Sequence, residues 1–203
     1  VTMLGKQKII SVKDASVIKK ALRSIQREIE TGKLKLEAEG SSRFVAEDVH
    51  MAIEHRLIQK VGDKGGKLHT ARSRNDQIAL DERLYLRNTI LNIQKLIRQL
   101  QKAFVGKAER YQSVVMPGYT HLQRAQPILL AHHLLAFVAM LERDYERFGD
   151  CLKRANRSPL GAGALAGTSF PIDRKSVAKQ LKLSSLVENS IDAVADRDVH
   201  VEF

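Results

Sequence analysis

A stretch without proline from about Asn75 to Arg110 constrains the fold of this chain more than any other feature. Apolar residues recur along it at the three- and four-residue spacing of one helix face. This stripe consists of Ile78, Tyr85, Ile90, Ile93, Leu96, Ile97, Leu100 and Phe104. A helix of roughly 35 residues is about 50 Å long at 1.5 Å per residue. That length exceeds the usual globular helix and predicts an elongated bundle or a coiled coil.

Two shorter helices are expected before the long one. The first has its apolar stripe over residues 17–29, with Asp14 as the N-cap and Gly32 after its end. The second is expected over residues 47–61 and begins with acidic residues, which the helix dipole favours at that end. A glycine-rich loop is expected over residues 62–68.

After the long helix, the segment Met116-Pro117-Gly118 interrupts the helical pattern. A second long helix is expected from Pro127, because proline is tolerated in a first helical turn, to about Arg154.

Residues 158–170 are rich in glycine and small side chains and are expected to form a loop. Asp173 is expected to cap a short helix, and Asn189 or Ser190 a last helix that is still continuing at residue 203.

The sequence therefore predicts an all-α protein, an elongated bundle of long helices, with no strand-rich region and no internal repeat. Hydrophobic residues make up 43% of the chain, enough for a sizeable core. Residues 1–70 are assigned to part of a small helical N-terminal domain, and residues 71–203 to the first part of the bundle.

Composition excludes several other classes of protein. The net charge is +11, but lysine and arginine are spread along the chain and aromatic residues are only 5%, so no nucleic acid partner is expected. No run of 18 apolar residues or secretory signal occurs, so we expect no membrane association and a cytoplasmic location. Cys151 is the one cysteine, expected near a core face, which excludes an internal disulfide and a cysteine-based metal cluster.

The first of three polar segments that could carry chemistry covers residues 69–77 and reads His-Thr-Ala-Arg-Ser-Arg-Asn-Asp-Gln. Guanidinium groups bind carboxylates through two parallel hydrogen bonds, and the N-terminus of the following helix adds N–H donors. The segment predicts an anion-binding site. The alternative is a capping segment with Ser73 or Asn75 as the N-cap.

The second polar segment covers residues 116–127 and contains Thr120, His121 and Gln123 just before a helix. A histidine here could transfer protons near neutral pH, with Thr120 and Gln123 orienting a substrate. The alternative is a histidine that only forms structural hydrogen bonds.

The third segment, residues 158–169, is glycine-rich but lacks the Gly-Lys-Ser/Thr sequence of a phosphate-binding loop. Its glycines are expected to permit tight backbone packing. The histidine spacings do not match a zinc helix, and no metal site is expected.

Taken together, these segments resemble argininosuccinate lyase, a family of the fumarase/aspartase superfamily. The signatures lie in residues 47–50, 66–77, 117–127, 158–161 and 189–194, in the order and at the spacing of that family. The run His-Thr-x-Arg-Ser-Arg-Asn-Asp-Gln is the most specific of them. The resemblance implies an anti elimination that splits argininosuccinate into arginine and fumarate, without a metal or organic cofactor. It also implies a homotetramer in which each active site gathers segments from three subunits.

The resemblance also implies roles for individual residues. His121 is the expected proton-transfer residue, although the family leaves open whether this histidine or a serine is the direct base. Expected substrate-binding residues are Ser73, Arg74, Asn75, Thr120 and Gln123, and Asp48 and His50 are expected to support the site.

Two stretches of the family pattern are absent from this chain. One is an N-terminal Trp-Gly-Gly-Arg-Phe stretch, and the other is the Gly-Ser-Ser-x-Met-Pro-x-Lys-x-Asn loop that carries the catalytic serine. We therefore expect the isolated 203-residue chain to be inactive. The alternative function is that of a delta-crystallin-like structural relative without activity.

Overall fold

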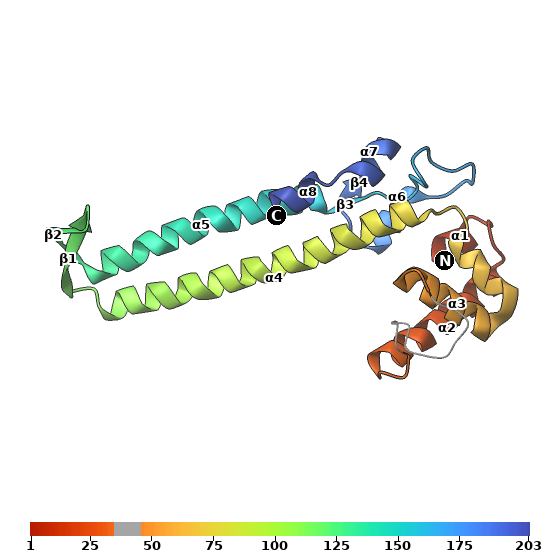
Figure 1. Cartoon of the computed structure of the whole chain (residues 1–203), viewed down its shortest axis with the longest axis horizontal. Helices are drawn as coiled ribbons and strands as arrows, with labels where there is room; N and C mark the ends of the chain where they lie inside the picture. Colours follow the sequence, from red (N-terminus) through yellow and green to blue (C-terminus); the bar gives the residue numbers. More distant parts are fainter. Residues whose placement is uncertain (35–45) are drawn as a thin grey trace. The chain divides into compact units, whose positions relative to one another are not determined.

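The computed structural model describes residues 1–34 and 46–203. The chain forms two compact units (Figure 1). The first unit comprises Val1–Ala79 and Ser158–Ala195, and the second comprises Leu80–Arg157 and Asp196–Phe203. The predicted domain division after residue 70 stays a prediction.

The first unit consists mainly of short helices and contains a main apolar core and a smaller buried cluster of Ala162, Val187 and Ala193. Its elements are α1 (Thr2–Lys6), α2 (Val12–Glu30), α3 (Val49–Val61), the 3-10 helix η1 (Gly62–His69), α6 (Arg174–Gln180) and α7 (Ser190–Ala195). Two short strands, β3 (Arg157–Ser158) and β4 (Ser185–Leu186), pair with each other. The main core consists of Leu4, Ile10, Ala15, Ile18, Ala21, Ile25 and Leu57.

Helix α2 begins earlier than predicted. Ser11 is its N-cap, because the Ser11 hydroxyl accepts a hydrogen bond from the Asp14 backbone N–H at 3.0 Å. The predicted N-cap, Asp14, was therefore wrong. The Asp14 carboxylate instead lies in the first turn and accepts a hydrogen bond from Lys67 at 2.6 Å, which links α2 to η1. Hydrogen bonds of the Asp14 carboxylate with the side chains of Lys67 and Ser11 hold its pKa below the usual range.

Helix α3 follows the prediction at both ends. The Asp48 carboxylate accepts a hydrogen bond from the Met51 N–H at 2.7 Å, and Gly62, with a φ of 68°, follows the last turn. The loop predicted over residues 62–68 was wrong, because this segment forms the 3-10 helix η1. Gly65 permits the close approach of η1 to α3, because a Cβ at this position would come within 2.9 Å of the Ile58 backbone nitrogen. Only glycine lets η1 approach α3 this closely.

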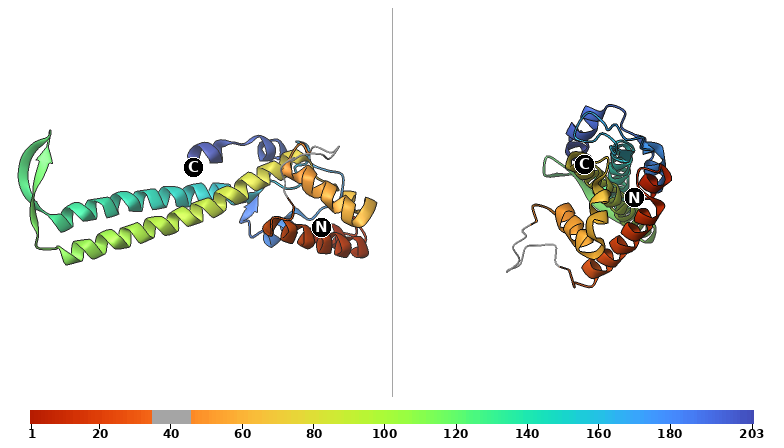
Figure 2. Two further views of the ribbon diagram at one scale, coloured as in Figure 1. Left: turned by 60° about the horizontal axis from the view of Figure 1, so that its bottom comes forward. Right: turned by 90° about the vertical axis from the view of Figure 1, so that its right-hand side faces the viewer.

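The second unit is built on two long antiparallel helices, which confirms the predicted all-α fold class. They are α4 (Arg74–Arg110, 37 residues) and α5 (Leu130–Ala155, 26 residues), and they lie side by side in both views of Figure 2. Helix α4 is about 55 Å long at 1.5 Å per residue. The first residues of α4 belong to the first unit.

Buried contacts near one end of this helix pair include Cys151, which is 1% exposed, as expected for a residue near the core. It packs with Leu86, Ile90 and Ala155 and with Val199 of the short helix α8 (Asp198–Glu202). Burial raises the pKa of the Cys151 thiol. Among the described residues, no helix combines the length and hydropathy that a membrane crossing requires.

The connection between α4 and α5 is a β-hairpin that the sequence did not predict. Strand β1 (Val115–Thr120) pairs with β2 (Gln123–Leu129), and Pro117 lies opposite Pro127. The prediction that Pro127 begins the second long helix was therefore wrong, because α5 begins at Leu130. Paired extended backbone satisfies the hydrogen bonds of this segment before the helix can begin.

The C-terminal segment also differs from the prediction of one continuing helix. Asn189 caps α7 as expected, since its side chain accepts hydrogen bonds from two backbone N–H groups at 2.9 and 3.1 Å. Helix α7 ends at Ala195, and the Asp196 carboxylate accepts from the Asp198 N–H at 2.8 Å, where α8 begins. Helix α8 is therefore a separate element and not a continuation of α7. Helix α6 begins after Asp173, its predicted cap.

Candidate active site

Two predicted site residues, Asp48 and Arg74, are in direct contact in the first unit. The Arg74 Nε atom lies 2.7 Å from Asp48 Oδ2, and both side chains are partly exposed, at 27% and 29%. Arg74 also donates a hydrogen bond from Nη1 to Gln77 Oε1 at 2.8 Å. The guanidinium group is therefore held in one orientation at the first turn of α4. His50 is half-buried in the first turn of α3.

The segment that contains Arg74 is bonded to the glycine-rich loop, residues 160–167. The Asn75 side chain donates a hydrogen bond from Nδ2 to the Ala164 carbonyl at 2.9 Å. The buried Asp76 carboxylate accepts hydrogen bonds from the backbone N–H groups of Ser73, Gly161 and Gly163. The structure thus places two of the three polar segments against each other.

Sequence reasoning gave Asp76 no individual role. The signal was present, because Ser73 and Asp76 have the spacing of a capping box. The Asp76 carboxylate accepts from the Ser73 N–H, and the Ser73 hydroxyl accepts from the Asn75 N–H at 3.3 Å. The predicted capping role of Ser73 is therefore compatible with a binding role of its neighbours.

The other predicted site residues lie together at the tip of the β-hairpin in the second unit. Thr120 and Gln123 are register partners, and His121 and Leu122 form the two-residue turn between them. All four are exposed, and Leu122 is 95% exposed. His121 and Leu122 have positive φ angles of 49° and 61°, as a tight hairpin turn requires. For residues other than glycine this backbone conformation is strained, and such strain is frequent at functional sites.

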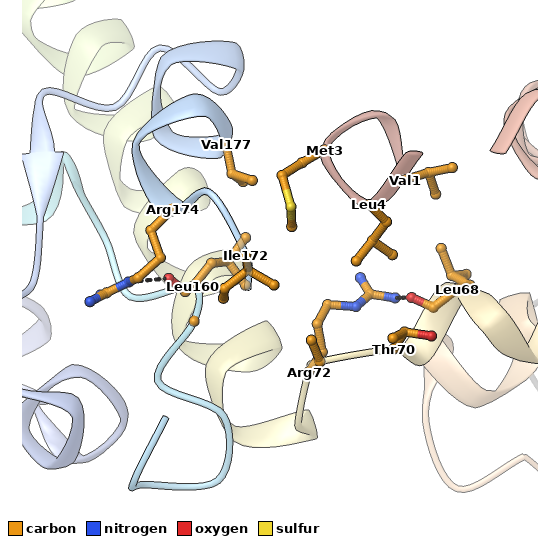
Figure 3. Close-up of a pocket in the computed structure, with 12 residues that line it drawn as sticks. Val1, Met3, Leu4, Leu68, Thr70, Arg72, Leu160, Ile172, Arg174 and Val177 are labelled. Atoms are coloured by element: carbon orange, nitrogen blue, oxygen red, sulfur yellow. Dashed lines mark hydrogen bonds between the residues drawn. The ribbon is translucent and has the colours of Figure 1, made fainter. Parts of the chain in front are cut away.

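A small cavity of about 110 Å³ lies beside Thr70 and Arg72 in the first unit (Figure 3). Its lining is mostly apolar and includes Met3, Leu4, Leu68, Leu160, Ile172 and Val177. Arg174 contributes the stem of its side chain and donates to the carbonyls of Leu160 at 2.9 Å and Val187 at 2.7 Å. Arg72 donates to the Leu68 carbonyl. None of the predicted site residues lines this cavity.

In residues 1–34 and 46–203, no three His, Cys, Asp or Glu side chains are grouped so that they could hold a metal ion.

Comparison with known proteins identifies close relatives of the whole chain. An argininosuccinate lyase from Syntrophobacter fumaroxidans is 58% identical over 201 residues, which are 99% of this chain and 42% of that protein. A solved structure of an EDDS lyase variant with bound fumarate has a TM-score of 0.87 at 32% identity, covering 98% of this chain and 38% of that one. A class II fumarase from Schistosoma mansoni has a TM-score of 0.77 at 18% identity, covering 99% and 49%, and shows the fold alone.

These relatives confirm the resemblance to argininosuccinate lyase. The chain spans about two fifths of the length of the curated relatives that it matches. A family model described as lyase matches residues 3–203, which is nearly the whole chain. The chain therefore belongs to the lyase family.

Proposed function

We propose that this lyase acts in arginine biosynthesis, in the cleavage of argininosuccinate to L-arginine and fumarate. The observation that carries the proposal is the 58% identity to an argininosuccinate lyase over 201 residues. The site geometry supports it, because Arg74 is preoriented by Asp48 beside the amide of Asn75. The proposed reaction needs no metal or organic cofactor, and the cytoplasm stays the predicted location.

We propose that Arg74 and Asn75, with Ser73 beside them, bind the substrate. The Arg74 guanidinium forms an ion pair with Asp48 and donates one of its five N–H groups to Gln77. The remaining donors suit a carboxylate, which accepts paired hydrogen bonds from such a group. Asp48 supports the site by fixing the guanidinium, and we propose the same supporting role for His50.

We propose that His121 transfers the proton and that Thr120 contacts a substrate carboxylate, with help from Gln123. Removal of a proton from the carbon next to a carboxylate places extra charge on that group, and the C–N bond then breaks. Donors aimed at the developing charge stabilise it most where water is excluded. Since the hairpin tip is exposed here, an effective site has to be covered by another part of the assembly.

In a homotetramer, neighbouring subunits would cover the exposed hairpin tip. The helix pair of the second unit exposes large apolar side chains, namely Leu91, Leu96, Leu100, Leu135, Phe137 and Met140, each 39–53% exposed. Exposed apolar surface of this kind is typical of association sites. We therefore expect the chain to self-associate or aggregate. Light scattering checks this, and a monodisperse monomer would contradict it.

A chimera tests the catalytic proposal. The matching segment of the Syntrophobacter fumaroxidans argininosuccinate lyase is replaced by residues 1–203 of this chain, and fumarate formation is followed by absorbance. We expect turnover in the chimera and a loss of at least 100-fold in kcat on His121→Asn, since loss of a proton-transfer group costs about 10²–10⁴-fold. Arg74→Met should raise KM. The matched control is His132→Asn, an exposed histidine on α5, which should leave both constants unchanged.

The outcomes separate the proposed enzyme from its alternative. A folded chimera without turnover would contradict the catalytic proposal and favour a delta-crystallin-like structural role. Full activity in the His121→Asn chimera would contradict the role proposed for His121 but not the proposed reaction. The isolated chain, assayed in parallel, is expected to be inactive.

A further inference from the structure

The Asp76 side chain is fully buried and bonded only to backbone donors among the described residues. Its exposure is 0%. Oδ1 accepts from the Ser73 N–H at 3.0 Å, and Oδ2 accepts from the N–H groups of Gly161 at 3.3 Å and Gly163 at 3.0 Å. A buried carboxylate is tolerated only when its oxygens are hydrogen-bonded. Asp76 therefore ties the start of α4 to the glycine-rich loop, using both oxygens.

The observed conformation of the loop requires glycine at two positions. Gly161 and Gly163 have φ angles of 99° and 60°. A Cβ at Gly163 would lie 2.7 Å from the Gly167 carbonyl oxygen. On the other side, Arg174 donates to the Leu160 carbonyl at 2.9 Å. Asp76 and Arg174 thus hold the loop from two directions.

This loop determines how the Asn75 amide is oriented. The Ala164 carbonyl can only accept a hydrogen bond, so the Asn75 atom that faces it at 2.9 Å has to be the donor Nδ2. One N–H of the amide is used in this bond. The second N–H and the acceptor Oδ1 remain for a ligand, and the side chain is exposed.

We infer that Asp76 is a positioning residue for substrate binding: through Gly161 and Gly163 it places the Ala164 carbonyl that orients the Asn75 amide. The inference deepens the proposed function and rests on it for the identity of the ligand, argininosuccinate. Asp76 itself is buried and does not touch the ligand.

Nuclear magnetic resonance of the 203-residue chain tests the inference. In the unaltered chain, the amide protons of Gly161 and Gly163 should exchange at least 100-fold more slowly than in an unstructured peptide. In Asp76→Asn, an NH2 group replaces one carboxylate oxygen. Because this group cannot accept a hydrogen bond, the bonds to that oxygen are lost. Exchange should become at least tenfold faster at the amides that lose their acceptor, either that of Ser73 or those of Gly161 and Gly163, and the Asn75 side-chain resonances should shift.

Binding of argininosuccinate to the chimera described above, made inactive by His121→Asn and measured by calorimetry, should weaken at least tenfold when Asp76→Asn is added. The matched control is Asp63→Asn, the same change at an exposed carboxylate of η1, which should alter neither exchange nor affinity. If Asp76→Asn lowers stability but leaves the Asn75 resonances and the affinity unchanged, Asp76 is purely structural and the inference is overturned.

Two further outcomes keep the test decisive. If Asp76→Asn does not fold, the unaltered chain decides, because unprotected amides at Gly161 and Gly163 would overturn the inference. If the chimera without the Asp76 change does not bind argininosuccinate, the substrate-binding role proposed for Arg74 and Asn75 is contradicted. The exchange data would then still show whether Asp76 holds the loop.

Discussion

The carboxylate of Asp48 caps α3 and also lies 2.7 Å from the Nε atom of Arg74, at the start of α4. One side chain thus fixes both the entry of one helix and the orientation of a proposed substrate-binding guanidinium. The two contacts respond differently to substitution, because the cap needs an acceptor oxygen and the ion pair needs a charge.

Substitutions at Asp48 should separate these contributions. Asp48→Ala removes the cap and the ion pair and should lower the free energy of unfolding by about 1–2 kcal/mol. Asp48→Asn keeps an acceptor for the Met51 N–H and should cost only about 0.5 kcal/mol, since partly exposed ion pairs contribute little. Urea denaturation measures both values. Equal losses in the two variants would show that the charge, rather than the cap, dominates.

Two glycines should respond to alanine with opposite signs. A Cβ at Gly161 would lie 2.7 Å from Arg174 Cδ, at a φ of 99°, so Gly161→Ala should destabilise the chain by about 1–3 kcal/mol. Gly106 lies inside α4 with open space around it, so Gly106→Ala should stabilise by about 0.5–1 kcal/mol. Thermal unfolding of both variants checks the signs. A neutral Gly161→Ala would mean that Arg174 can move aside without loss.

The buried Arg83 should matter more than any exposed cation of α4. Its side chain is 5% exposed, forms an ion pair with Asp196 and donates to the Arg154 carbonyl at 2.9 Å. Arg83→Met leaves the Asp196 carboxylate without its cation and should cost about 3–5 kcal/mol. The double variant Arg83→Met/Asp196→Asn should recover part of that loss. Lys102→Met, at an exposed site on the same helix, should change stability by less than about 0.5 kcal/mol in calorimetry.

Acid should weaken the link between α2 and α3 at Glu28. Hydrogen bonds from Lys60 and Arg56 hold the pKa of Glu28 below its usual 4.5. Because the folded pKa is lowered, this contribution is complete above pH 4.5 and is lost as the pH falls through the folded value. Glu28→Gln should therefore be less stable than the unaltered chain at pH 7, and the difference should shrink below pH 4.5.

Urea unfolding at pH 7, 5 and 3 measures this dependence. The control is Glu30→Gln, at an exposed residue of the same helix that contacts a neutral side chain, Gln26. A difference between Glu28→Gln and the unaltered chain that stays constant down to pH 3 would contradict the prediction.

Local sequence signals predicted the helices well and the hairpin poorly. The apolar stripe of α4 follows the helix period, and the caps Asp173 and Asn189 bond to backbone a few residues away, so periodicity and side-chain chemistry suffice to find them. Pro127 was misleading because proline fits both a first helical turn and a strand edge. The pairing of β1 with β2 decided between the two.

The sequence by itself determined the helical class of the chain, the proposed polar segments and the family that they resemble. Only the tertiary structure decided that Asp48 reaches Arg74, and that Asp76 binds the N–H groups of Gly161 and Gly163. These contacts join residues far apart in the chain, where no local preference specifies a partner. They depend on how closely two backbone segments approach, which packing and the glycines of the loop determine.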